Sequence, residues 1–248
     1  MCATCGCSVT HEHTHEISLE QKVLARNDLL ADQNRKWLAE RDVLAVNLMS
    51  SPGSGKTTLL ERTIRDLDLP MGVIEGDQET KFDADRIAAT GAPAYQINTG
   101  TGCHLDAAML AHALDHLAPA HGSVVFIENV GNLVCPALFD LGEAARVVIM
   151  SVPEGPDKPL KYPHMFRSAD VILLNKVDLL PYLDFPMQTF TDHVRQVNPH
   201  AEVIPVSATL GAGTDAWYAW LYSISGNTNV TTAPSSFANS NVPPSTRT

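Results

Sequence analysis

The sequence predicts an α/β domain in which helices cover both faces of a mainly parallel sheet. Two observations support this fold class: short apolar runs alternate with helical stretches, and most positions within the runs are apolar. Strands of this kind are buried on both faces, as in doubly wound sheets. The runs that we expect to form strands span residues 43–49, 72–76, 93–97, 123–128, 146–152, 170–175 and 202–207.

The two ends of the chain differ in composition from this central region. Both ends are polar and poor in apolar residues, so they cannot offset the entropy lost on ordering, and we expect a flexible arm and a disordered tail. Ser18 followed by Gln21 matches a capping box and predicts the start of a helix. Apolar residues then recur with helical spacing at Val23, Leu24, Leu30, Trp37 and Leu38. The expected organisation is an arm (1–16), a lead-in helix (17–42), a main domain (43–225) and a tail (226–248).

Composition limits the classes of partner. The 248 residues carry a formal net charge of -11, which removes the long-range attraction to nucleic acids and acidic membrane surfaces, and we expect neither as a partner. No stretch approaches the roughly 18 apolar residues of a membrane span, and the start of the chain lacks a signal-peptide pattern, so we expect a cytoplasmic protein. In a reducing compartment its 5 cysteines are expected to be thiols or metal ligands.

A glycine-rich segment, SSPGSGKTTLLE, directly follows the first apolar run. Its pattern is typical of the phosphate loop of P-loop nucleoside triphosphatases, in which Lys56 reaches the β and γ oxygens and the Thr57 hydroxyl ligates Mg²⁺. One position departs from the pattern, because Ser50 stands where the first glycine is usual. An ordinary glycine-rich turn is the weaker interpretation, given the flanking strand and helix. We expect nucleotide contacts from Gly53, Ser54, Gly55, Lys56, Thr57 and Thr58.

The base is predicted from DVILLNKVDLL, which places Asn175, Lys176 and Asp178 at the end of a buried strand. A carboxylate accepts two hydrogen bonds from the N1 and N2 edge of guanine, whereas adenine would leave the charge unpaired. The segment therefore favours GTP over ATP, although four such residues could also form an ordinary loop after a strand. Ser207 and Ala208, after the last predicted strand, are expected to complete the base pocket.

Acidic residues follow two other predicted strands. Glu128 and Gly131 lie in FIENVGNLVCP, where the carboxylate can hold Mg²⁺ through water and the glycine amide can approach the γ-phosphate. Asp77 lies in VIEGDQET and could orient the attacking water, but a solvated turn carboxylate is an equally good interpretation of its spacing. No arginine is evident as a transition-state residue within the chain, so we expect slow turnover.

Two cysteines lie near these segments and indicate a metal site. Cys135 is four residues beyond Gly131, and Cys103 with His104 lies in the glycine-rich turn NTGTGCHLD. Thiolate and imidazole suit Ni²⁺ or Zn²⁺, but three ligands leave a tetrahedral site incomplete, so water or a second protomer must supply the rest. We favour a site at a dimer interface. Simple burial of each thiol is an alternative of similar weight.

The arm carries a different set of ligands. Cys2, Cys5 and Cys7 can converge if the chain wraps a metal ion, and the α-amine of Met1 is close enough in sequence to be a fourth ligand. Thiolates with an amine support the square-planar geometry that Ni²⁺ accepts.

Taken together, the arm, SSPGSGKTT, EGDQET, GTGCH, ENVGNLVCP and NKVD resemble the HypB-type GTPases, which deliver nickel during maturation of nickel-iron hydrogenases. The resemblance covers about residues 18–225 and the arm. It implies the dimerising metal-GTPase class of P-loop proteins, with the urease nickel chaperone and the nitrogenase iron protein as fold relatives. It further implies that Asp77 is the switch acid and that Cys2, Cys5 and Cys7 hold nickel tightly. The catalytic residues that we expect are Lys56, Asp77, Glu128 and Gly131.

The resulting hypothesis is a GTPase that times nickel transfer. GTP would close a homodimer and rearrange the internal metal site, and hydrolysis would release nickel to a hydrogenase large-subunit precursor, with other accessory proteins as partners. The expected cofactors are GTP, Mg²⁺, Ni²⁺ and Zn²⁺. One rival is a nickel-binding or storage protein whose nucleotide domain is only an assembly scaffold, and a second is a small-molecule kinase.

Overall fold

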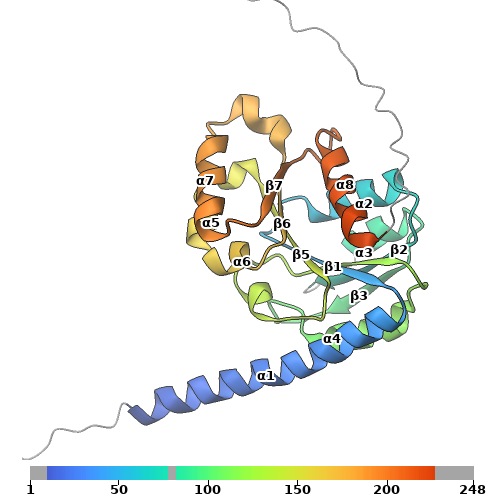
Figure 1. Ribbon diagram of the computed structural model, residues 1–248, viewed down its shortest axis with the longest axis vertical. Coiled ribbons are helices and arrows are strands. Elements are labelled where there is room, and N and C mark those ends of the chain that lie inside the picture. The colour runs from blue at the N-terminus through green and yellow to red at the C-terminus, as the bar shows by residue number, and fades with distance from the viewer. Residues whose placement is uncertain (1–9, 78–81, 227–248) are drawn as a thin grey trace, which may run out of the picture.

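The computed structural model describes residues 10–77 and 82–226. In this part of the chain the strands form one 7-stranded sheet in the order β3-β2-β4-β1-β5-β6-β7, and every pair of neighbours is parallel. The predicted α/β class with a mainly parallel sheet is confirmed (Figure 1). The strands are β1 (Leu44–Ser50), β2 (Met71–Asp77), β3 (Ala94–Asn98), β4 (Val124–Glu128), β5 (Ala145–Ser151), β6 (Val171–Asn175) and β7 (Glu202–Pro205).

Helices and short 3-10 turns connect the strands. Because each strand runs parallel to its neighbours, every connection must cross back over the sheet, and helices make most of these crossings. The helices are α1 (Thr10–Glu40), α2 (Lys56–Asp66), α3 (Phe82–Ala88), α4 (Ala107–Leu117), α5 (Lys158–Lys161), α6 (Pro163–Arg167), α7 (Met187–Val197) and α8 (Thr214–Ser225). The 3-10 turns are η1 (Cys135–Leu138), η2 (Val152–Glu154) and η3 (Val177–Tyr182).

The core lies on both faces of the sheet. Alternate residues of the strands pack on one face against α2, α3 and α8, where Trp217 of α8 is fully buried beside Phe126 of β4. The opposite face packs in one half against α1 and α4 and in the other half against α6 and α7. Burial on both faces explains why the strand sequences are almost continuously apolar.

Helix α1 differs from its prediction at the start. It begins at Thr10, so the prediction that it begins at Ser18 is wrong. The sequence from Thr10 to Glu40 contains neither glycine nor proline, and nothing in it interrupts the helix at Ser18. The C-terminal part packs against α4, with Leu38 buried, whereas Val23, expected on the apolar face, is 51% exposed. Figure 1 shows the N-terminal part extending past the domain.

The strand order reverses its course beside β1, which pairs with β4 on one side and with β5 on the other. The connection after β1 leads to β2 on one side of the sheet, whereas the connection after β4 leads to β5 on the other side. In parallel α/β sheets ligands bind at the carboxyl ends of the strands next to such a point. The loop after β1 is therefore the expected ligand loop. None of the described helices is long and apolar enough to cross a membrane.

Candidate functional site

The loop from Ser50 to Gly55 joins β1 to α2 at the carboxyl edge of the sheet. Gly55 has a φ of 99°, and a Cβ there would collide with the amide of Asn175, so only glycine fits this turn. The Lys56 ammonium donates a hydrogen bond of 2.9 Å to Oγ of Ser50. The serine that replaces the usual first glycine thus holds the lysine within the loop.

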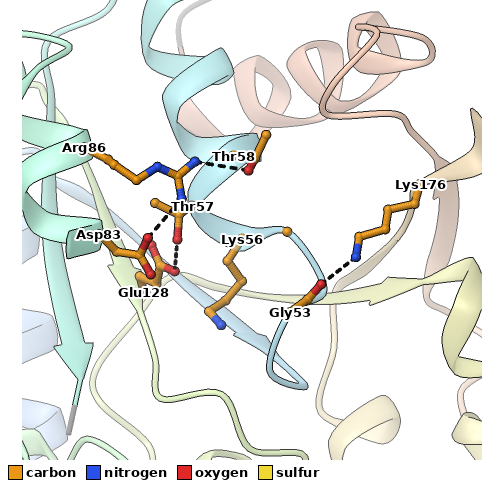
Figure 2. A pocket seen from close by; sticks show the side chains of 9 residues that line it. Gly53, Lys56, Thr57, Thr58, Asp83, Arg86, Glu128 and Lys176 are labelled. Carbon is orange, nitrogen blue, oxygen red and sulfur yellow. Dashed lines mark hydrogen bonds and ion pairs between the residues drawn. The ribbon is translucent and has the colours of Figure 1, made fainter. Parts of the chain in front are cut away.

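A cavity of about 320 Å³ opens at this loop (Figure 2). Residues predicted from the sequence that line it are Gly53, Gly55, Lys56, Thr57, Thr58, Glu128 and Lys176. Two further residues, Asp83 and Arg86, reach it from α3. Neither residue belongs to a motif of the sequence, and Arg86 adds a guanidinium to the cavity.

Two carboxylates lie side by side on adjacent strands here: Glu128 of β4, which lines the cavity, and Glu75 of β2. Oγ1 of Thr57 donates a hydrogen bond of 2.9 Å to Oε1 of Glu128, whose Oε2 is buried without a partner. Glu75 faces Glu128 in register across β2 and β4, and its Oε2 is also buried without a partner. Burial, followed by the negative charges of Glu128, Asp83 and Asp77, raises the pKa of Glu75 to about 8. Burial likewise raises the pKa of Glu128.

This arrangement fits a hard divalent cation. Unpartnered buried carboxylate oxygens are costly unless a proton or a cation compensates them, and a threonine hydroxyl with carboxylate oxygens is a ligand set that suits Mg²⁺. Thr57 and Glu128 are the residues that would hold the ion, directly and through water.

The predicted base-binding residues are brought together beside the loop. The Lys176 ammonium donates to the Gly53 carbonyl oxygen at 2.7 Å, and the Asn175 amide donates to the Ser54 carbonyl oxygen at 2.9 Å. Asn175 Oδ1 in turn accepts a hydrogen bond of 3.0 Å from the amide N–H of Ala208. One asparagine therefore connects the phosphate loop with the loop after β7.

Asp178 lies next to Ser207 across these two segments. The Ser207 hydroxyl donates a hydrogen bond of 2.6 Å to Oδ1 of Asp178. This bond orients the carboxylate while leaving its second oxygen outside the pair. The sequence analysis placed Asp178 and Ser207 in one base pocket, and the two residues meet although they are 29 positions apart.

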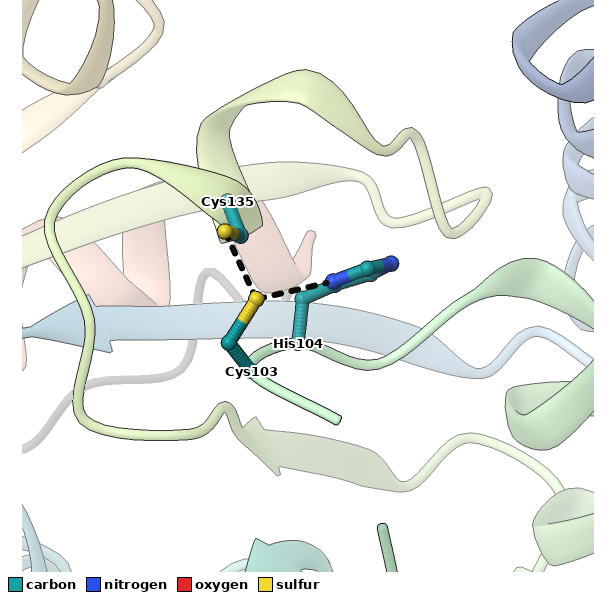
Figure 3. Close-up of side chains that lie close together, drawn as sticks. All are labelled: Cys103, His104 and Cys135. Atoms are coloured by element: carbon teal, nitrogen blue, oxygen red, sulfur yellow. Dashed lines mark hydrogen bonds between the residues drawn. The ribbon is translucent and has the colours of Figure 1, made fainter. Parts of the chain in front are cut away.

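Cys103, His104 and Cys135 converge at a second site (Figure 3). Their donor atoms all lie within 4.8 Å of one another, with 2.7 Å between the two Sγ atoms and 3.6 Å from Cys103 Sγ to Nδ1 of His104. The bond from Cys103, followed by burial, raises the pKa of the Cys135 thiol, and burial lowers the pKa of His104. The His104 ring stacks on Phe139 at 3.8 Å between centroids. Two thiols and a mainly neutral imidazole fit a borderline-soft metal ion.

The chain from Glu128 to Cys135 links the two sites. Gly131 lies against the phosphate loop, since a Cβ at Gly131 would be 3.2 Å from Pro52. Asn129 is buried, and its Oδ1 accepts the amide N–H of Leu105, next to His104, at 3.2 Å. The segment from Glu128 to Cys135 thus contacts the phosphate loop through Gly131 and, through Asn129, the residue that follows His104.

Other predicted residues lie apart from these clusters. Asp77 ends β2, and its carbonyl oxygen accepts the amide N–H of Thr99 at 2.9 Å. Among the described residues the cavity lining includes Asp83 but not Asp77. Cys2, Cys5 and Cys7 fall outside the described residues, so the predicted arm site stays a prediction.

Glu154 was also missed by sequence reasoning. Its carboxylate accepts hydrogen bonds from the amide and the hydroxyl of Ser151, at 2.8 and 2.9 Å, and another from the Ser51 hydroxyl of the phosphate loop. The sequence signal was available, because Ser151 and Glu154 have capping-box spacing. The segment after β5 therefore supports the phosphate loop rather than only connecting two strands.

The fold and the loop after β1 define a P-loop nucleotide-binding protein, here with a cluster of two thiols and an imidazole as a second site. The family model described as "CobW/HypB/UreG, nucleotide-binding domain" matches residues 44–205. Over 207 residues the chain is 58% identical to a protein of Rhizobium leguminosarum named hydrogenase maturation factor HypB, covering 83% of this chain and 69% of that protein.

Two solved structures are similar over most of the chain. The crystal structure of HypB from Helicobacter pylori in complex with nickel has a TM-score of 0.77 and 36% identity, covering 84% of this chain and 99% of the other. HypB from Archaeoglobus fulgidus has a TM-score of 0.76 and 41% identity, covering 82% and 100%. The chain belongs to the CobW/HypB/UreG family and, within it, to the HypB hydrogenase maturation factors.

Proposed function

We propose that this protein is a GTP-hydrolysing nickel metallochaperone that delivers Ni²⁺ to the precursor of a nickel-iron hydrogenase. The observation that carries the proposal is the segment from Glu128 to Cys135, which contacts the phosphate loop at Pro52 and ends at a metal-binding cysteine. A change in the nucleotide is thereby transmitted to the thiol through this one segment of chain. Membership of the HypB family supports the same assignment.

The nucleotide is GTP in this proposal. The Asp178 carboxylate accepts two hydrogen bonds from guanine, and its bond from Ser207 fixes the carboxylate before the base arrives. Lys176 and Asn175 brace the phosphate loop by bonds to the carbonyl oxygens of Gly53 and Ser54. Base recognition and phosphate binding are therefore mechanically connected.

Hydrolysis breaks the bond between the γ-phosphorus and the oxygen that bridges it to the β-phosphate, while the oxygen of water forms the new bond. Lys56 neutralises charge on the β and γ oxygens, the Gly131 amide approaches the γ-phosphate, and Asp77 orients the attacking water. When Mg²⁺ is bound by Thr57 and Glu128, it supplies further positive charge at the same oxygens. These roles account for the expected catalytic residues.

The internal metal site is shared by two copies of the chain in a GTP-dependent homodimer. Cys103, His104 and Cys135 provide three ligands, one fewer than a closed tetrahedral site needs. Val134 and Leu138, which flank Cys135, are 54% and 45% exposed, and apolar side chains beside an incomplete site favour burial against a second copy. Ni²⁺ is the cargo of this site, and Zn²⁺ fits the same ligands.

The arm is the entry point for nickel, with Cys2, Cys5 and Cys7 as ligands. From there the ion passes to the internal site and then to the hydrogenase large-subunit precursor, with other accessory proteins taking part. The recipient is proposed from the role named for the relatives of this chain.

Metal content of the full-length protein tests the proposal. After equilibration with Ni²⁺, Cys2→Ala is expected to lose the arm ion, and Cys103→Ala the internal ion, each measured with GDP and with a non-hydrolysable GTP analogue. Lys56→Ala should remove the effect of nucleotide on the internal ion and reduce GTP hydrolysis by at least about 100-fold. If Cys103→Ala loses no metal in either nucleotide state, the internal site is wrong.

Two further assays separate the rival functions. Nickel transfer to the precursor that ignores nucleotide would favour the storage scaffold. Hydrolysis of GTP with no added acceptor, together with no hydrolysis of ATP, would exclude a small-molecule kinase.

A further inference from the structure

Arg86 lies at the mouth of the nucleotide cavity and is held there by acidic neighbours. Its guanidinium donates to Oε2 of Glu61 at 2.8 Å, to Oδ1 of Asp83 at 3.0 Å and to the Thr58 hydroxyl at 3.2 Å. Figure 2 shows it reaching from α3 to the first turn of α2, above Thr57. Arg86 therefore contacts Thr58, the residue that follows Thr57, the expected Mg²⁺ ligand.

The charges around the cavity explain why an arginine is needed there. Lys56, Lys176 and Arg86 supply positive charge to the lining, whereas Asp83 and Glu128 supply negative charge. A nucleoside triphosphate brings several negative charges next to these carboxylates, so a mobile cation that can move from a carboxylate to a phosphate lowers the repulsion. The Arg86 side chain is 42% exposed, so this movement does not require it to leave a buried position.

We propose that Arg86 binds the phosphates of the bound nucleotide and leaves Glu61 when it does so. This inference rests on the proposed function, because it deepens the description of the same GTP site. Glu61 is 14% exposed at its side chain and keeps a second cation when Arg86 leaves, since Arg65 lies 3.7 Å from its other oxygen. Glu61 thus holds Arg86 in an ion pair when no nucleotide is bound, and this pair competes with the nucleotide for Arg86.

The movement has a structural consequence for α3. This helix follows β2 in the chain, and Arg86 joins it to α2 through Thr58 and Glu61. When Arg86 exchanges Glu61 for phosphate, the contact between α2 and α3 changes from a protein ion pair to one bridged by the nucleotide. Binding of phosphate therefore changes the contacts of α3, the helix that follows Asp77 in the chain.

The chain offers a matched control for this proposal. Arg65 and Arg86 both pair with Glu61, but only Arg86 lines the nucleotide cavity. We expect Arg86→Ala to weaken binding of Mg²⁺ and a non-hydrolysable GTP analogue by about 10- to 100-fold, the loss typical of a charge-assisted hydrogen bond. Arg65→Ala should change the same affinity by about twofold or less, as for an exposed ion pair.

A second variant separates phosphate binding from a structural role. If Arg86 only joins α3 to α2 through Glu61, then Glu61→Gln and Arg86→Ala break the same pair and both weaken nucleotide binding. If the ion pair with Glu61 competes with the nucleotide for Arg86, Glu61→Gln releases Arg86 and tightens binding of the GTP analogue by about two- to fivefold. Opposite signs for the two variants support the proposal, and equal signs overturn it.

The readout is the dissociation constant of the full-length protein for the GTP analogue, with thermal unfolding as a check on folding. Arg86→Lys should recover part of the affinity, because lysine keeps the charge but not the planar donors. Should Arg86→Ala bind as tightly as Arg65→Ala, Arg86 is not a phosphate residue. Binding of the analogue does not require hydrolysis or nickel transfer, so this result stays separate from any failure of the proposed function.

Discussion

Gly131 packs against Pro52 so closely that an added Cβ would lie 3.2 Å from the proline Cα, Cγ and N atoms. Pro52 belongs to the phosphate loop, and Gly131 lies four residues before Cys135. The contact therefore joins the segment that carries a metal ligand to the segment that binds phosphate. A coupling between nucleotide and metal needs a connection of this kind, because a ligand shifts a conformation only if the two states contact it differently.

Gly131→Ala tests this contact directly. The φ of Gly131 is not in the left-handed region, so alanine introduces no backbone strain, and the three atoms nearest to its added methyl group all belong to Pro52. The proline ring is rigid and cannot turn aside, so we expect a loss of about 1–3 kcal/mol in the free energy of unfolding and a fall in kcat for GTP of about tenfold or more. Steady-state kinetics and urea unfolding measure the two effects. An unchanged kcat at equal stability would show that the contact plays no part in hydrolysis.

Asn129 gives a second connection, and its removal should uncouple the sites. Asn129→Ala leaves the buried amide N–H of Leu105 without its acceptor, which costs about 1–3 kcal/mol of stability. We expect both ligands still to bind, while the effect of the GTP analogue on nickel affinity is lost. Asn47→Ala is the control, because Oδ1 of Asn47 accepts a hydrogen bond from Nδ2 of Asn129, whereas the Leu105 amide donates to Oδ1 at the opposite end of the same side-chain amide. Equal coupling in both variants would argue against Asn129 as the connection.

Asp178→Asn should change the base that is bound. An asparagine amide cannot accept two hydrogen bonds from guanine, but it can donate one to the O2 oxygen of xanthine. We expect GTP affinity to fall by about 100-fold and xanthosine triphosphate to become the better ligand. Competition binding with both nucleotides measures the change, and Asp184→Asn, at an exposed position, serves as the control. Retained preference for GTP would mean that Asp178 does not contact the base.

Glu75 makes stability depend on pH. Its pKa is about 8 in the folded protein and near 4.5 when unfolded, so folding favours the protonated form. Its contribution to the free energy of unfolding is complete below pH 4.5 and is lost as pH rises toward 8, by about 1.4 kcal/mol for each unit of pKa shift. The carboxylates of Glu128, Asp83 and Asp77 reinforce the effect, and Lys56 opposes it.

Glu75→Gln should flatten this pH dependence. Urea unfolding at pH 6 and pH 8, without nucleotide and with a chelator, compares the variant with the original protein. Part of the slope should remain, because the pKa of Glu128 is also raised by burial. A slope unchanged by Glu75→Gln would show that this residue is ionised throughout the range.

The sequence predicted the features that depend on local pattern. The strands were found because burial on both faces requires nearly continuous apolar runs, and the phosphate loop because its glycines and lysine must follow one another at a fixed spacing. Asp178 and Ser207 were both predicted to contribute to the base pocket because each follows an apolar run that was expected to form a strand.

The remaining features depend on tertiary packing. Arg86 reaches the cavity only because α3 lies beside α2, and no local pattern marks that approach. On α1 the buried face includes Asn27 and Asn34, which are polar in sequence but donate to carbonyl oxygens of Asp140, Ala107 and Leu141 in the structure. Hydropathy could not identify them, since the partners that permit their burial lie more than 70 positions away.

The most direct test of the account is the affinity of the internal site for Ni²⁺ in the two nucleotide states. In full-length Cys2→Ala protein, we expect the GTP analogue to change the nickel dissociation constant by at least fivefold relative to GDP, the lower end of typical coupling. Nickel should change the affinity for the analogue by the same factor, because coupling between two sites is reciprocal. Equal nickel affinity in both nucleotide states, with nucleotide affinity indifferent to nickel, would contradict the proposal that one segment after Glu128 serves both sites.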